Sequence, residues 1–267
     1  MVKMTTVGTV ESLWRYPVKS MRGEDLPELF MGFSGMYGDR CAAFRSSTAR
    51  KGFPYLNANV QPSMLTYQPR FCADRSFQPP NLAEAMSIEP GVTPANADAE
   101  EMSLDVVTPS GDVLSIDDPA LIERLGEGLR GAPQLKLVRS DRALTDCRPV
   151  SLISMATIRQ IESELDIPLD PRRFRANIYF NLTTERAGFA EDEFVGRRLR
   201  IGSSATVMVL ERDPRCSLLS LDPDTGEQNP AVFRHVVQAH ENLAGVYCAV
   251  LVEGVLRKGD SIELLAD

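Results

Sequence analysis

The chain has 267 residues, of which 43% are hydrophobic and 25% are charged, so it has enough apolar material to bury a sizeable core. It carries 29 basic and 37 acidic residues, and the net charge of −8 opposes the basic footprint that nucleic acids and anionic membranes require. The longest apolar run, residues 246–252, is too short to span a bilayer, and the N-terminal residues lack the apolar segment of a signal peptide. We therefore expect a cytoplasmic protein without a nucleic-acid or membrane partner.

Strands dominate the elements that the residue pattern predicts. In the first half of the chain, it predicts a strand over 7–16, a flexible proline-containing excursion over 74–102, a hairpin over 103–117 and a helix over 119–129. In the second half, it predicts strands over 134–140 and 173–182, a strand pair over 198–212, helices over 151–165 and 230–241, and final strands around the Lys258-Gly259-Asp260 turn. The predicted class is β-rich α+β, with one β unit to about residue 125 and a β-barrel-like unit after it.

The cysteines and histidines exclude several common kinds of site. The five cysteines are widely spaced and form no C-x-x-C pair, which excludes a zinc knuckle and a thioredoxin motif. The two histidines, His235 and His240, are five residues apart, whereas side chains that share a helix face are three or four apart. We therefore expect neither a histidine-based metal site nor a Ser-His-Asp hydrolase. A catalytic metal would be held by thiolate, by carboxylate or by a ligand from outside the chain.

A basic cluster lies at the start of the strand predicted over 173–182. Residues 172–177 read Arg-Arg-Phe-Arg-Ala-Asn, and strand alternation would place Arg173, Arg175 and Asn177 on one face. Guanidinium groups match phosphate oxygens in a bidentate way, so this face would suit phosphate or a phosphorylated cofactor. The alternative is a solvated strand edge whose arginines pair with nearby aspartates. The pattern alone leaves both readings open.

A second candidate is Cys216, which follows a predicted strand. Arg212 and Arg215 precede it in the sequence, and cations beside a thiol favour the thiolate, which is a nucleophile and a soft-metal ligand. A turn at residues 222–226, Asp-Pro-Asp-Thr-Gly, comes shortly afterwards. The alternative is that Cys216 packs as a small hydrophobic side chain, as most isolated free cysteines do.

Several motifs in a fixed order resemble those of one family. They are Tyr-Pro-Val-Lys-Ser at 16–20, Gly-Asp-Arg at 38–40, Arg-Phe-Arg-Ala-Asn-Ile at 173–178, Arg-Cys at 215–216, Asp-Pro-Asp-Thr-Gly-Glu at 222–227 and Lys-Gly-Asp at 258–260. In this order the chain resembles MOSC-domain proteins that carry the family's N-terminal β-barrel domain. They are related to the mitochondrial amidoxime-reducing component and to the C-terminal domain of molybdenum cofactor sulfurase. The resemblance implies an N-terminal β-barrel-like domain over 1–125 and a MOSC β-barrel domain over 126–267 with a few flanking helices.

The resemblance also implies a site. Cys216 matches the family's catalytic cysteine, which ligates the metal of a molybdenum cofactor (Mo-molybdopterin). The positions that would bind the rest of the cofactor are Lys19, Arg40, Asp146, Cys147, Arg148, Arg173, Arg175 and Asn177. Cys147 stands where relatives often have a hydroxyl residue, and this places a second thiol near the expected site.

The activity that the resemblance implies is two-electron reduction of small N-hydroxylated substrates, such as amidoximes or hydroxylamines. The chain contains no ferredoxin-like cysteine set, so the electrons would come from a separate electron-transfer protein or reductase. Two alternatives use the same residues. One is a sulfur carrier with a persulfide on Cys216, and the other is a protein that carries the cofactor without turnover.

Overall fold

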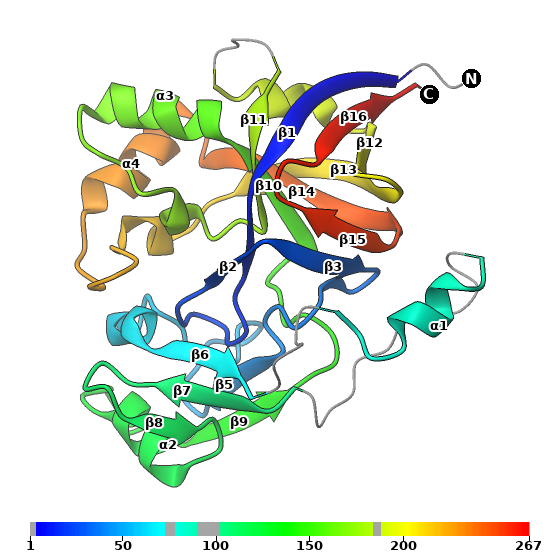
Figure 1. The fold of residues 1–267 in the computed structure, drawn as a ribbon. Coiled ribbons are helices and arrows are strands. Elements are labelled where there is room, and N and C mark those ends of the chain that lie inside the picture. The colour runs from blue at the N-terminus through cyan, green and yellow to red at the C-terminus, as the bar shows by residue number, and fades with distance from the viewer. Residues whose placement is uncertain (1–3, 73–77, 90–101, 184–187, 267) are drawn as a thin grey trace.

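The computed structural model describes residues 4–72, 78–89, 102–183 and 188–266. Its centre is a closed barrel of seven strands in the order β11-β10-β14-β13-β12-β16-β1, which closes where β1 pairs with β11 (Figure 1). These strands are β1 (Met4–Arg15), β10 (Val150–Ser154), β11 (Ile178–Leu182), β12 (Arg198–Ile201), β13 (Ala205–Pro214), β14 (Leu243–Val252) and β16 (Ser261–Leu265). All pairs are antiparallel except β10 with β11. The β-rich α+β class predicted from the sequence is confirmed.

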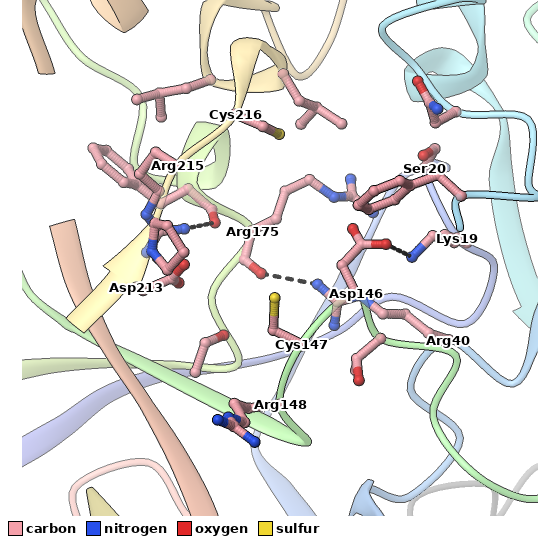
Figure 2. A pocket seen from close by; sticks show the side chains of 18 of the residues that line it. Lys19, Ser20, Arg40, Asp146, Cys147, Arg148, Arg175, Asp213, Arg215 and Cys216 are labelled. Carbon is pink, nitrogen blue, oxygen red and sulfur yellow. Dashed lines mark hydrogen bonds and ion pairs between the residues drawn. The ribbon is translucent and has the colours of Figure 1, made fainter. Parts of the chain in front are cut away.

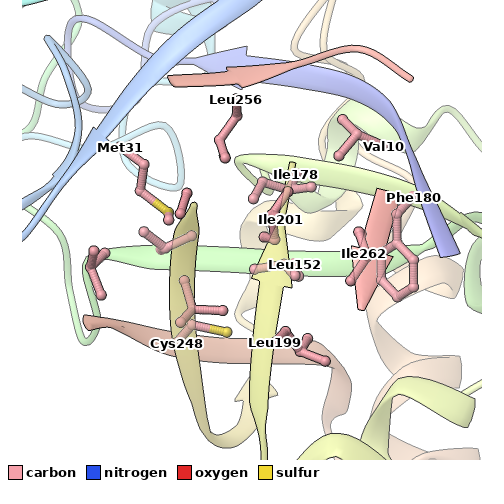
Figure 3. Packing of buried hydrophobic residues seen from close by; sticks show 14 of the residues in the cluster. Val10, Met31, Leu152, Ile178, Phe180, Leu199, Ile201, Cys248, Leu256 and Ile262 are labelled. Atoms are coloured by element: carbon pink, nitrogen blue, oxygen red, sulfur yellow. The ribbon is translucent and has the colours of Figure 1, made fainter. Parts of the chain in front are cut away.

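The barrel is filled by apolar side chains that alternate along its strands. Leu13, Leu152, Ile178, Leu199 and Val207 are all fully buried in one cluster. Figure 3 shows side chains from opposite strands meeting inside the barrel, where they exclude water from the interior. Burial of this apolar surface is the main favourable contribution to folding.

The N-terminal half adds smaller sheets below the barrel (Figure 1). Strand β2 (Glu24–Leu26) pairs with the end of β1. One smaller sheet contains β3 (Glu28–Gly32), β4 (Gly35–Met36) and β15 (Gly254–Arg257). The other two contain β5 (Ala42–Ser46) with β9 (Leu135–Arg139), and β6 (Gln68–Phe71) with β7 (Leu104–Val107) and β8 (Val113–Ser115). The helices here are η1 (Pro62–Thr66), α1 (Leu82–Met86) and α2 (Pro119–Gly126). The flexible excursion predicted over 74–102 lies largely outside the described residues, and its described part contains α1.

Strand pairs cross the boundary predicted at residue 125 in both directions. Strand β1 from the start of the chain is a barrel strand between β11 and β16. Strand β9, which follows the predicted boundary, pairs with β5 in the N-terminal half. The division into 1–125 and 126–267 therefore stays a prediction, and the two halves share strands.

The remaining helices gather on one side of the barrel (Figure 1). They are α3 (Met155–Leu165), η2 (Pro171–Phe174), η3 (Ala190–Phe194), η4 (Ser217–Ser220) and α4 (Pro230–Ala239). The helix predicted from 151 starts later, because Ser154 ends β10 and its side chain caps the helix by accepting from Thr157 N at 3.1 Å. No helix in the described part of the chain is both long and apolar enough to cross a membrane.

Candidate functional site

One pocket of about 440 Å³ lies where the barrel meets the N-terminal sheets. Both halves line it, with Lys19 and Arg40 coming from the N-terminal half and the 145–148 loop, the 173–177 segment and the end of β13 coming from the other. All positions that the sequence predicts for the site line this pocket: Lys19, Arg40, Asp146, Cys147, Arg148, Arg173, Arg175, Asn177 and Cys216. The structure therefore brings these residues together, and their roles stay a prediction.

Two thiols face the pocket from different walls. Cys216 follows β13, is the N-cap residue of η4 and is exposed. Cys147 lies in the loop before β10 and is also exposed. Figure 2 shows both sulfur atoms directed toward the space around Arg175. Partial desolvation by the surrounding protein raises the pKa of the Cys147 thiol, and neighbouring carboxylates raise it further.

The two arginines that precede Cys216 in the sequence, Arg212 and Arg215, have other partners. Arg215 donates from Nε to Ala244 O at 2.7 Å and pairs through Nη2 with Asp213 at the same distance. Arg212 pairs with Glu241 at 2.9 Å on the surface. The guanidinium groups of Arg212 and Arg215 are thus engaged by carboxylates and by a backbone carbonyl.

Two other cations of the pocket, Arg40 and Arg175, stack on one tyrosine, Tyr16. The guanidinium carbons of Arg40 and Arg175 lie 4.9 and 4.2 Å from the centroid of the Tyr16 ring. Arg40 pairs with the buried Asp39 and donates to Arg175 O at 3.1 Å (Figure 2). Arg175 Nη2 is buried without a hydrogen-bond partner among the described residues. A buried guanidinium with a spare donor is prepared for an anionic ligand.

Desolvation lowers the pKa values of two cations in the pocket, Arg175 and Lys19. Desolvation, and then the nearby charge of Arg40, lowers the pKa of Arg175 to about 10, so it remains protonated near neutral pH. Desolvation also lowers the pKa of Lys19, against the opposing effect of Asp146, whose Oδ1 lies 2.8 Å from Nζ. An anion in the pocket would relieve the repulsion between these groups.

The predicted strand over 173–182 begins only at Ile178. Arg172 and Arg173 belong to η2, and Arg175 has a left-handed backbone with φ of 50°. Arg173, Arg175 and Asn177 therefore reach the same pocket without lying on one face of a strand, and the predicted strand alternation is wrong here. The turn after η2, rather than a strand face, directs Arg175 inward.

Two of the predicted residues make mainly internal contacts. Arg173 donates to Ser220 O and to Asp222, both at 3.1 Å, and so holds the turn after η4. Asn177 accepts from Ser151 N at 3.2 Å and donates to Trp14 O at 3.3 Å. These contacts position the walls of the pocket.

Asp213, which was not predicted from the sequence, lines the pocket two residues before Arg215. Its side chain is buried, and Oδ1 lacks a hydrogen-bond partner among the described residues. Desolvation raises its pKa to about 6, although Arg215 works to lower it. The motif containing Cys216 includes Asp213, but only burial sets it apart from ordinary loop aspartates.

The donor set suits one class of ligand. An exposed soft thiol and a buried, incompletely paired arginine lie in the same pocket, together with Lys19 and Arg40. Thiolate is a ligand for soft metals, and arginine recognises phosphate. The residues therefore fit a phosphorylated cofactor that carries such a metal.

Residues 139–263 match the family model of the MOSC domain. The chain therefore contains a MOSC domain, and this domain family is one that binds the molybdenum cofactor. Among curated proteins, it is 23% identical over 303 residues to the mitochondrial amidoxime reducing component 2 of Rattus norvegicus, covering 99% of this chain and 86% of that one.

Solved structures similar to this chain include two bacterial proteins. The YuaD protein from Bacillus subtilis is 15% identical with a TM-score of 0.49, and the match covers 100% of both chains. YiiM from Geobacillus stearothermophilus is 22% identical with a TM-score of 0.35, over 45% of this chain and 55% of that one. Similarity at this level adds nothing to the family assignment.

Proposed function

We propose that the pocket binds the molybdenum cofactor and that the protein reduces small N-hydroxylated substrates with electrons from a separate electron-transfer protein. The observation that carries this proposal is the presence in one pocket of the exposed Cys216 and of the half-buried Arg175, whose buried Nη2 has no hydrogen-bond partner among the described residues. The relative named as an amidoxime reducing component supports the substrate class.

The proposal gives the pocket residues distinct tasks. Cys216 Sγ would be the protein's ligand to the metal, and Arg175 with Arg40 and Lys19 would hold the phosphate of the cofactor. When bound, the cofactor supplies a metal that exchanges two electrons. The 145–148 loop, which carries Asp146, Cys147 and Arg148, would close the opposite wall.

The chain itself can hold a proton where the reduction needs one. Reduction of an N–OH group to N–H takes up two electrons and two protons and releases water. Asp213, with a pKa of about 6, can carry a proton at Oδ1 within the pocket. The exposed Phe53 ring and the side chains of Tyr55 and Leu218 line the same pocket and offer apolar surface for a substrate.

The test is the molybdenum and pterin content of protein made in a host that synthesises the cofactor. We expect near-stoichiometric molybdenum in the wild type, loss of metal in Cys216→Ala, and retention in Cys72→Ala, which replaces an exposed cysteine outside the pocket. In a second arm, Arg175→Ala loses a charge-assisted contact worth about 1.5–3 kcal/mol and retains less pterin. Arg172→Ala is its control, since Arg172 pairs with Asp170 and Asp224 instead. Equal cofactor content in Cys216→Ala and wild type would refute the proposed metal ligand.

A sulfur carrier is the second candidate, because two exposed thiols share the pocket. A persulfide on Cys216 could pass its outer sulfur to an acceptor. Intact mass after treatment with a sulfur donor decides between the two, since a carrier gains one sulfur atom on Cys216 and contains no metal. Protein that holds the cofactor and reduces no N-hydroxylated substrate would instead be a cofactor carrier.

A further inference from the structure

Three potential metal ligands meet outside the pocket, on the side of the barrel covered by helices. Glu164 lies near the end of α3, His235 lies within α4 and His240 follows α4. Their ligand atoms all lie within 4.8 Å of one another. Glu164 Oε2 is 2.7 Å from His235 Nε2 and 2.6 Å from His240 Nε2. None of the three lines the proposed cofactor pocket.

The expectation that these histidines face different ways was wrong. That expectation assumes a helix through both residues, but α4 ends at Ala239 and His240 has φ −129° and ψ 28°. The change in backbone direction turns the His240 ring back toward His235, so that the ring centroids are 5.5 Å apart. A separation of five residues therefore brings the side chains together because the helix ends between them.

Neighbouring side chains hold the ligands in place. Gln160, one turn before Glu164, donates to Glu164 Oε1 at 2.8 Å and so leaves Oε2 for the histidines. The Phe189 ring stacks on His240 at 4.2 Å between centroids. Supporting contacts of this kind fix the orientation of metal ligands in proteins. The side chains of Glu164, His235 and His240 are 30%, 23% and 13% exposed, so an ion can enter from solvent.

The donor atoms of the cluster also suit a cation. Glu164 offers a carboxylate oxygen, Oε2, and His235 and His240 each offer the Nε2 atom that contacts it. A divalent ion would be bound by one carboxylate and two imidazoles.

We propose that Glu164, His235 and His240 form a binding site for a divalent transition metal of the zinc class, with water completing the coordination. Two imidazole nitrogens and a carboxylate oxygen are a ligand set that zinc uses in proteins. Zinc–ligand bonds of about 2.0–2.2 Å in tetrahedral geometry require ligand atoms about 3.4 Å apart. The present contacts of 2.6 and 2.7 Å would open by less than an ångström around the ion.

Such an ion would join α3 to α4. These helices pack against each other, and α4 also packs on η4, the helix whose N-cap residue is Cys216. Bonds from the ion to Glu164, His235 and His240 would replace the two hydrogen bonds that now join these partly exposed side chains. Binding to the folded state alone raises the free energy of unfolding, so Tm should rise with zinc concentration.

The experiment uses the full chain, first with Co²⁺ as an optical probe and then with Zn²⁺ in competition with a chromophoric chelator. We expect one equivalent of metal per chain, a Co²⁺ spectrum without thiolate charge-transfer bands, and a rise in Tm. Because loss of a supporting residue alone weakens metal sites about 10–100-fold, the variants Glu164→Gln, His235→Gln and His240→Gln should each bind at least about tenfold more weakly.

Two controls keep the outcome decisive. Glu241→Gln changes the carboxylate next to His240, which pairs with Arg212 outside the cluster, and should bind like wild type. The double variant Cys147→Ser, Cys216→Ser removes the thiols of the pocket and should also bind like wild type. Equal affinity in wild type and all three ligand variants, loss of binding in the cysteine double variant, or no binding by wild type would overturn the proposal. Unfolding curves without metal confirm that each variant is folded.

Discussion

Asp213 illustrates how the interior decides the chemistry of a single residue. Its pKa lies near 6 in the folded protein against an ordinary value of 3.8, because burial disfavours the charged carboxylate. The folded state therefore binds this proton more tightly than the unfolded state. Its contribution to the free energy of unfolding is full below about pH 4, is lost as the pH rises through 6, and is on the order of 3 kcal/mol.

We predict that Asp213→Asn reduces the fall in the free energy of unfolding between pH 5 and pH 8, since the amide does not titrate. Urea denaturation at several pH values measures this slope. The slope of Asp213→Asn is compared with that of Asp192→Asn. Desolvation also raises the pKa of Asp192 to about 6, but Asp192 is only half-buried whereas Asp213 is buried. A slope in Asp213→Asn equal to that of wild type would contradict the assignment.

Individual residues also differ in whether the sequence could predict their place in a site. Cys216 and Arg175 were predicted because motifs mark them, and the structure places both in one pocket. Asp213 was missed because its short-range pattern is that of a loop aspartate, and only packing buries it. The cluster around His240 was missed because the spacing rule assumes an uninterrupted helix, whereas α4 ends one residue earlier.

At the scale of elements, η3 depends on one buried carboxylate. Glu191 is fully buried and accepts from Ser154 N at 3.1 Å, Ser154 Oγ at 2.8 Å and Thr157 Oγ1 at 2.7 Å. It thereby fastens η3 to the junction of β10 and α3. Removing it leaves these donors buried without their acceptor, and each such group costs about 1–3 kcal/mol.

We therefore predict that Glu191→Ala lowers the free energy of unfolding by at least about 1–3 kcal/mol, measured by urea denaturation. Glu123→Ala is the control, because Glu123 is an exposed carboxylate on the helix α2, and its replacement should change stability by less than about 0.5 kcal/mol. Similar losses in both variants would show that the buried contacts of Glu191 contribute little.

Local signals predicted some elements well and others poorly. The hairpin of β7 and β8 and the helix α2 follow from their turn residues and from Asp118, which caps α2 by accepting from Ala120 N at 2.8 Å. Residues 173–177 were predicted as strand because basic and apolar residues alternate there. The structure has a 3-10 turn instead, since Pro171 starts η2 and the Asp170 side chain caps it.

At the scale of the whole molecule, closure of the barrel could not be read from local pattern. Met4 pairs with Leu265, so the seventh strand comes from the opposite end of the chain. No short-range signal reports such a pairing, because the residues that meet are almost the full chain apart. The pocket depends on this arrangement, since β1 leads directly into Tyr16 and Lys19.

The arrangement predicts that residues 139–267 do not fold alone, although they include the whole family match. Without β1, the edges of β11 and β16 are unpaired and the core loses Val10 and Leu13. We expect no cooperative thermal transition by circular dichroism. Appending residues 4–15 after Leu265 through a short turn should restore one, because β1 and β16 are antiparallel and Met4 lies opposite Leu265. The same appended segment with Val10→Asp and Leu13→Asp should not restore it, and a cooperative transition in the bare fragment would show that the barrel closes without β1.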